Sequence, residues 1–173
     1  LTEGFVSVIA EEDILYTITR GGVEYGFDTL SEALTAANEN ETITLIKSYS
    51  INSENFIQKL NKSVTIDLGD NTITSAAYFE VSGSGTNVTI TNGSVVYNTE
   101  VDNVSDVAFR IFSGATLTLD GVTVDWSAGG RAAEVGTSGT SQAGTLNLTN
   151  GSVLKGGEVG VLLAGTATDD TDN

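Results

Sequence analysis

Short segments in which aliphatic residues alternate with threonine, asparagine or aspartate recur along this chain. Four of them share one pattern, at 64–68, 88–93, 117–121 and 146–151, and a fifth at 43–46 precedes them. Alternation with a period of two residues is typical of a strand with one buried face. With one aliphatic residue of each segment taken as equivalent, the steps are 21, 24, 29 and 29 residues between Leu45, Ile66, Ile90, Leu119 and Leu148.

Each of the last four segments is followed by two further elements. A turn built on Asn-Gly, Asp-Gly or Gly-Asp-Asn leads to a second short strand, at 72–74, 94–97, 122–124 and 152–154. A third strand then ends at a glycine, which is Gly83, Gly114, Gly139 or Gly165. Because the same three-part unit returns every 20 to 30 residues, we expect an all-β, right-handed parallel β-helix of about five three-stranded coils.

A β-sandwich is the alternative fold, since two-residue Asn-Gly turns also join β-hairpins. Hairpins alone do not explain why the unit has three parts each time. The chain has no proline, and this favours the β-helix, because each of its strands must donate hydrogen bonds to a neighbouring coil.

The first 41 residues follow a different pattern. Residues 16–20 and 23–27 flank Gly21-Gly22 and predict a hairpin. Residues 29–38 predict an amphipathic helix with Leu30, Ala33, Leu34 and Ala37 on one face, capped by Asp28 or Thr29, with Glu32 completing a capping box on Thr29. Such a helix is suited to cover the open end of a coil. The domain is therefore divided into a cap at 1–41, coils at 42–165 and an acidic polar tail at 166–173.

Both ends of the chain suggest contacts with a partner. The tail contains no segment that predicts a helix able to cover the last coil, so we expect that end to meet further coils of a longer parent or another subunit. A spare apolar strand contains Phe5, Val6, Val8 and Ile9. We expect it to cap its own domain or to pair with a neighbouring subunit by strand addition.

The arrangement of residues 22–68 resembles the opening of pectin-lyase-like β-helices of prokaryotic surface proteins. The similarity lies in Tyr25, the helix motif at 29–37, Thr-Ile-Thr-Leu-Ile-Lys at 42–47 and Val-Thr-Ile-Asp-Leu-Gly-Asp-Asn-Thr-Ile at 64–73. It extends over about residues 14–165. The resemblance implies an extracellular or cell-surface location and a structural or adhesive, often non-catalytic, role.

The amino-acid composition limits the kinds of partner and of catalytic or metal site that this chain can have. The 23 acidic and 7 basic residues give a net charge of −16, which disfavours nucleic acid and anionic membranes as partners. There is no cysteine and no histidine, which removes thiolate metal sites and the commonest general base. No apolar run approaches the roughly 20 residues that cross a bilayer, so we expect no membrane insertion.

We assign no catalytic residue, no cofactor and no metal ligand, and we do not expect an enzyme. The lyases that this fold resembles hold calcium with clustered acids beside a basic residue, and their hydrolase relatives use grouped aspartates with a histidine. Asp120 and Asp125 flank one strand and Asp169-Asp170 lie in the tail, where solvated carboxylates are expected. Arg110 is instead predicted to stand in an outward ladder between Glu80 and Glu134. A lyase or hydrolase remains the least favoured alternative.

Two long connections between second and third strands, at 97–107 and 125–131, are predicted to project from the same flank. Tyr97, Asp102, Trp126 and Arg131 are candidate contacts for a glycan or protein ligand. Trp126 has the parity of the inward Val122 and Val124, so core packing is its main interpretation.

Calcium could bind in these acidic loops, although no ligand set is assignable. Seven Asn-x-Ser/Thr sequons occur, and Asn92, Asn103 and Asn150 are the candidate glycosylation sites.

Three functions are therefore compared. The first is an extracellular structural or adhesive module, either a stalk segment or a self-assembling subunit of a surface filament or sheath. The second is a glycan-binding module that uses the two loops, and the third is a polysaccharide lyase or hydrolase.

Overall fold

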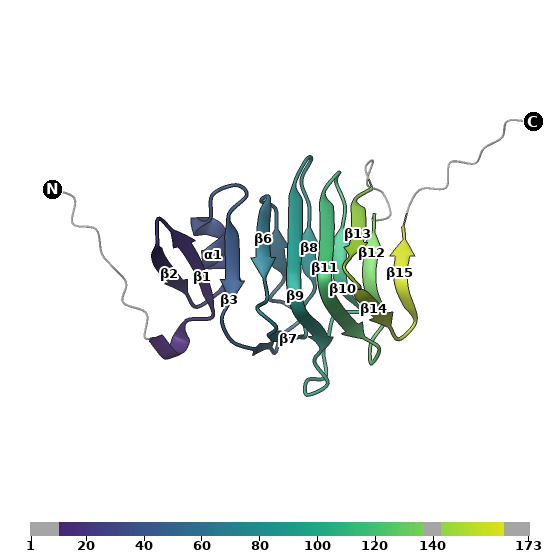
Figure 1. Ribbon diagram of the computed structural model, residues 1–173. Helices are drawn as coiled ribbons and strands as arrows, with labels where there is room; N and C mark the ends of the chain where they lie inside the picture. Colours follow the sequence, from purple (N-terminus) through teal and green to yellow (C-terminus); the bar gives the residue numbers. More distant parts are fainter. Residues whose placement is uncertain (1–10, 137–142, 165–173) are drawn as a thin grey trace, which may run out of the picture.

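The chain is wound into a right-handed parallel β-solenoid of about four turns (Figure 1). The computed structural model describes residues 11–136 and 143–164. The first strands of successive coils pair in parallel in chain order, from residues 42–45 to residues 145–149, and so do the third strands, from residues 58–60 to residues 159–163. The predicted fold class is confirmed, and the expected number of about five coils is slightly too high.

The strands group into five rungs, and the chain winds about four full turns from the first rung to the last. The rungs are β3 (Thr42–Leu45), β4 (Tyr49–Ile51) and β5 (Gln58–Leu60); β6 (Val64–Asp67), β7 (Thr72–Ser75) and β8 (Phe79–Val81); β9 (Asn87–Tyr97) and β10 (Val107–Ile111); β11 (Thr116–Trp126) and β12 (Arg131–Val135); and β13 (Thr145–Thr149), β14 (Val153–Gly156) and β15 (Val159–Leu163).

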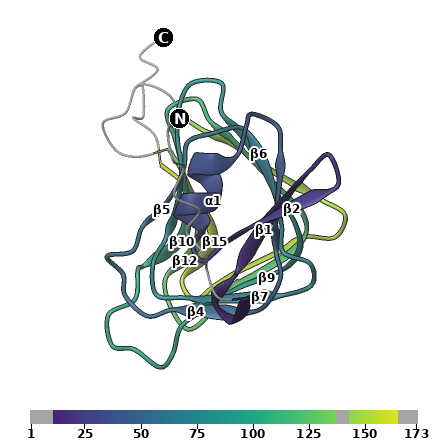
Figure 2. The same ribbon diagram turned by 90° about the vertical axis from the view of Figure 1, so that its left-hand side faces the viewer.

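In the third and fourth rungs, the predicted first and second strands form one bent strand, β9 or β11, because the ladder between these two strands continues through the corner. Figure 2 shows this bend as an L-shaped outline of the coil. Gly93 stands at the corner of β9 with φ 153°, and a Cβ there would lie 2.6 Å from Asn71 O. Glycine is therefore required at this corner by its conformation and by its closeness to the preceding rung.

The interior is filled by ladders of aliphatic residues. In one ladder Ile43, Ile66, Ile90 and Leu119 occupy equivalent positions and are at most 2% exposed. The observed partner of Ile66 in β3 is Ile43, so the predicted equivalence of Leu45 with Ile66 is wrong by two residues. A shift of two keeps the same face of the strand inward, and the alternating pattern alone does not reveal it.

The N-terminal end is closed by the predicted hairpin and helix. β1 (Tyr16–Arg20) pairs antiparallel with β2 (Val23–Phe27) and with β3, which extends the larger sheet beyond the first rung. The helix α1 (Leu30–Ala36) lies across the opening of the coil (Figure 2). Its N-cap is Thr29, whose Oγ1 accepts a hydrogen bond from Glu32 N. Lys62 Nζ donates to the carbonyls of Leu34 and Ala37 and so holds the other end of α1 against the second rung.

Charges on the outer face of the smaller sheet alternate along the solenoid axis. Lys59 pairs with Glu80, Glu80 with Arg110, and Arg110 with Glu134 in the strand register. The predicted order of Glu80, Arg110 and Glu134 is therefore confirmed. Arg110 Nε lies 3.8 Å from a Glu134 carboxylate oxygen, and the guanidinium lies 4.5 Å from the centre of the Tyr78 ring. These contacts support a structural role for Arg110.

Candidate functional site

The connections at 97–107 and 125–131 project from one flank of the coil, as predicted, and the longer one extends below the body in Figure 1. Their aromatic residues pack against each other. Trp126 is fully buried and donates its Nε1 hydrogen to Ser105 O at 2.9 Å. The rings of Tyr97 and Trp126 meet edge to face with their centroids 5.4 Å apart. Trp126 is thus a core residue that fixes the base of the longer loop, and it is not placed to meet a ligand.

Arg131, another predicted contact, also joins the two loops. Its guanidinium pairs with Asp106 and lies 3.3 Å from Glu134, and these carboxylates raise its pKa. Arg131 N donates to Asp106 O at 2.8 Å. Three of the four predicted ligand contacts, Tyr97, Trp126 and Arg131, therefore hold the flank together.

Asp102 is the predicted contact that faces solvent. With neighbouring Val101 and Asn103 and with residues 52–55 of the preceding loop, it lines a polar hollow of about 220 Å³. Buried Asn98 joins the two loops beneath this hollow, since its side-chain amide donates to Ile51 O at 3.2 Å and to Asn52 Oδ1 at 3.0 Å. Asn98 was not among the residues predicted from the sequence. An asparagine directly after a second strand was the available signal.

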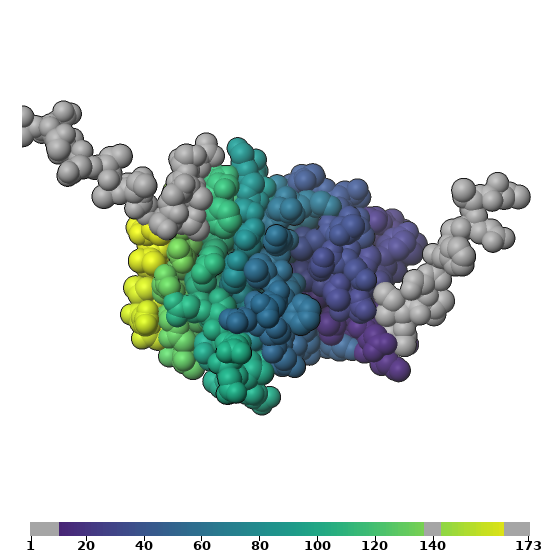
Figure 3. All heavy atoms as spheres, turned by 180° about the vertical axis from the view of Figure 1, so that it is seen from behind, coloured from purple at the N-terminus to yellow at the C-terminus, as the bar shows by residue number. Residues whose placement is uncertain are grey.

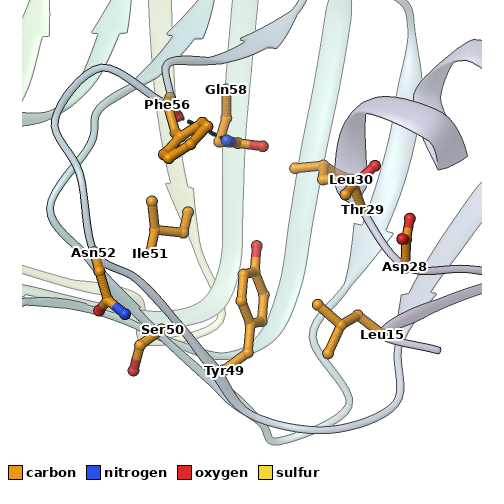
Figure 4. A pocket seen from close by; sticks show the side chains of 10 residues that line it. All are labelled: Leu15, Asp28, Thr29, Leu30, Tyr49, Ser50, Ile51, Asn52, Phe56 and Gln58. Carbon is orange, nitrogen blue, oxygen red and sulfur yellow. Dashed lines mark hydrogen bonds between the residues drawn. The ribbon is translucent and has the colours of Figure 1, made fainter. Parts of the chain in front are cut away.

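A second hollow, of about 340 Å³, lies between α1 and the first rung (Figure 4). Phe56 and Gln58 form one side, Leu15, Asp28 and Leu30 form the other, and the Tyr49 hydroxyl points between them. Phe56 is 65% exposed. The Tyr49 hydroxyl is hydrogen-bonded to that of Tyr16, and burial raises the pKa of Tyr49 to about 12. A phenol with this pKa stays protonated at neutral pH and does not act as a general base there.

The carboxylates considered for catalysis are engaged in the scaffold. Asp120 accepts hydrogen bonds from Thr149 and Asn150 of the next rung. Asp125 accepts from Ser127 and Lys155, and these contacts lower its pKa. Asp169 and Asp170 lie outside the described residues. Within residues 11–136 and 143–164, no three His, Cys, Asp or Glu side chains are grouped to hold a metal ion. Calcium binding in the acidic loops stays a prediction.

The three candidate glycosylation residues are exposed. Asn92 Nδ2 donates to Asp67 Oδ1 at 3.1 Å, and Asn150 makes the same contact with Asp120 two rungs later. These two asparagines therefore brace the corners of the coil. Asn103 stands in the projecting loop, at the polar hollow that Asp102 also lines.

The last rung differs from all the others because its inward positions are open to solvent. Leu148 continues the ladder of Ile66, Ile90 and Leu119 but is 47% exposed. Leu163 continues the ladder of Ile111 and Val135 and is 77% exposed. On their outer sides, β13 and β15 have no pairing strand within the described part of the chain. The last rung, at the right-hand end in Figure 1, thus exposes apolar side chains and, among the described residues, strand edges without a partner strand.

The predicted N-terminal assembly strand, with Phe5, Val6, Val8 and Ile9, lies outside the described residues, as does the tail after Ala164. No helix in the described part of the chain is both long and apolar enough to cross a bilayer. Comparisons with protein-family models, with curated proteins and with solved structures find no match.

Proposed function

We propose that this chain is a structural and adhesive module of an extracellular surface protein. In this proposal the solenoid is one segment of a longer rod, and the β13–β15 rung is a junction that receives another β-rung. The junction belongs either to a stalk, where further coils continue the rod, or to a filament or sheath built from separate subunits. The proposal includes a place among the pectin-lyase-like β-helices, based on the motifs at 29–37, 42–47 and 64–73.

One observation carries the proposal: the interior ladder becomes exposed only at the last rung. Exposure rises from 0% at Leu119 to 47% at Leu148, and from 8% at Val135 to 77% at Leu163. Fully burying a leucine side chain contributes about 1.5–3 kcal/mol, so another rung on this end would be stabilising. At the other end, α1 and the hairpin already cover the ladder. A solenoid that is closed at one end and open at the other is suited to extension in one direction.

Lengthening the coil by one rung tests this. Leu163 and Ile111 occupy equivalent positions through Val135. A repeat of residues 112–135 placed directly after Leu163 therefore keeps the natural connection between rungs. We expect amide hydrogen exchange in β13, β14 and β15 to slow by about tenfold or more, because these strands become internal.

The matched control carries serine in place of the copied Leu117, Leu119 and Val122, which keeps the added length but removes its buried face. If exchange in β13–β15 is unchanged by the intact added rung, the C-terminal rung is a finished end and the proposed role is wrong. Surface labelling of the tagged protein in its own cells checks the extracellular location.

The glycan-binding alternative has one supporting observation, the polar hollow beside Asp102. Its amides Asn52, Asn55 and Asn103 and the carboxylates Glu54 and Asp102 are groups that hydrogen-bond sugar hydroxyls. Binding on a glycan array that is lost in Asp102→Ala but kept in Glu24→Ala would favour this function. A flat array would count against it.

A further inference from the structure

The open end of the solenoid is the face formed by the last rung, with β13, β14 and β15. Its apolar side chains Leu148, Val159 and Leu163 are exposed by 38–77%. We infer that this face is self-complementary and joins two copies of the chain tail to tail about a two-fold axis. The inference rests on the proposed function in one respect, that the last rung accepts another rung. It adds that, for this chain by itself, that rung belongs to a second copy. Because such a pair closes after two copies, the inference favours the stalk form of the proposed function over the filament or sheath.

The opposite end is a poor partner for this apolar face. The side chains that α1 presents to solvent include Ser31, Glu32 and Thr35. A head-to-tail contact would place the open ladder of one copy against these polar groups, and the desolvated glutamate would oppose the association. The end of the molecule that offers further open aliphatic ladder residues is the last rung itself. Two copies that meet there bury apolar surface on both sides.

The distribution of net charge along the chain favours the same contact. Residues 145–164 contain one lysine and one glutamate, which cancel. Residues 11–41 contain eight acidic residues and one arginine, which gives −7. Two molecules of net charge −16 repel each other least when they approach through a neutral surface. Asp169, Asp170 and Asp172 follow this rung in the sequence and lie outside the described residues, so screening salt belongs in the experiment.

The backbone of the last rung allows such a joint. Within residues 11–136 and 143–164, no strand pairs with the outer edge of β13, so its N–H and C=O groups on that side have no ladder partner there. A two-fold axis perpendicular both to the solenoid axis and to β13 brings β13 of one copy beside β13 of the other in antiparallel orientation, which is a stable ladder geometry. The contact is isologous and closes after two copies. The α1 ends then lie at the two far ends of the dimer, as Figures 1 and 3 indicate by their separation from β15.

Sedimentation equilibrium of the full chain in about 0.5 M NaCl tests the association. The chain mass is 17.9 kDa, and we expect a single step to twice that mass with no larger species. Leu148→Asn with Leu163→Asn should raise the dimer dissociation constant by at least about 100-fold, since each change acts twice in an isologous contact. The matched control is Val23→Asn with Tyr25→Asn, which removes exposed apolar side chains from β2 at the other end and should leave the dimer unchanged.

Spin labels test the orientation. The chain has no cysteine, so Asn147→Cys and Ser31→Cys each supply one label site. We expect a short intermolecular distance for the label at 147 and none within range for the label at 31. A monomer at all concentrations would overturn the inference, and so would a polymer series that the Val23 and Tyr25 changes abolish. If the dimer is absent while the added rung still protects β13–β15, the proposed function stands and only the two-fold contact fails.

Discussion

At the residue scale, Asn98 shows how the flank is held in place. It is 1% exposed, its backbone N–H donates to Ser75 O, and its Oδ1 accepts from Glu100 N. Its amide nitrogen donates to Ile51 O and Asn52 Oδ1 in the loop of the first rung. This one side chain thereby joins the third rung to the first, although the second rung lies between them in the sequence.

We predict that Asn98→Ala lowers the free energy of unfolding by about 1–3 kcal/mol, because it leaves buried backbone groups without partners. Chemical denaturation followed by circular dichroism measures this change. Asn55→Ala, at an exposed position of the loop that Asn98 holds, should change the free energy by less than about 0.5 kcal/mol. Equal effects of the two variants would contradict the assigned role.

At the element scale, a clamp between Arg20 and Glu41 joins the hairpin to the end of α1. The guanidinium donates to both Glu41 carboxylate oxygens, at 2.7 and 2.6 Å, and to Ala36 O at 2.6 Å. Asn38 donates to the same carboxylate through its backbone and its side chain. The hydrogen bonds from Arg20 and Asn38 lower the pKa of Glu41 to about 2.

Because the pKa of Glu41 is lowered by folding from about 4.5 to about 2, its contribution to stability is present above pH 4.5 and is lost as the pH falls toward 2. We therefore predict that Glu41→Gln is less stable than the natural chain at pH 7 and that the difference disappears near pH 2. Urea denaturation at several pH values measures it. Glu24→Gln, at an exposed position of β2, is the control. A difference that does not depend on pH would show that the charge of Glu41 is not the cause.

Elements with strong local signals were predicted from the sequence. The Gly21-Gly22 turn, the Thr29 cap and the Val-Thr-Ile-Thr alternation all have local physical causes, and the corresponding hairpin, helix and strands are found. β4 and β5 were missed, because three residues such as Tyr49–Ile51 are too short to show a period. The predicted register of the first ladder was wrong by two residues, because Ile43 and Leu45 lie on the same face of the strand.

The site was harder to predict than the fold. Tyr97 and Trp126 belong to the residue types that bind ligands and also to those that fill cores, and only the packing of the two loops decides between these roles. The engagement of Arg131 with Asp106 depends on a contact across 25 positions in sequence, which no local pattern contains.

At the scale of the whole molecule, the net charge of −16 opposes compaction. The five ion pairs in the described part of the chain recover little of this, since surface pairs contribute about 0–1 kcal/mol each. We predict that the thermal unfolding midpoint rises between about 0.02 and 1 M NaCl, because the Debye length falls to about 3 Å at 1 M. Calorimetry at fixed protein concentration measures this. A falling midpoint would mean that the ion pairs outweigh the general repulsion.

The closed N-terminal end also sets an order in time. The hairpin and α1 are synthesised before the coils, and they contact β3 and β5 of the first rung. Each later rung then leaves the ribosome beside an edge that is already folded, and it pairs with the rung just before it. Folding can thus advance with translation, one rung at a time, without waiting for a distant segment.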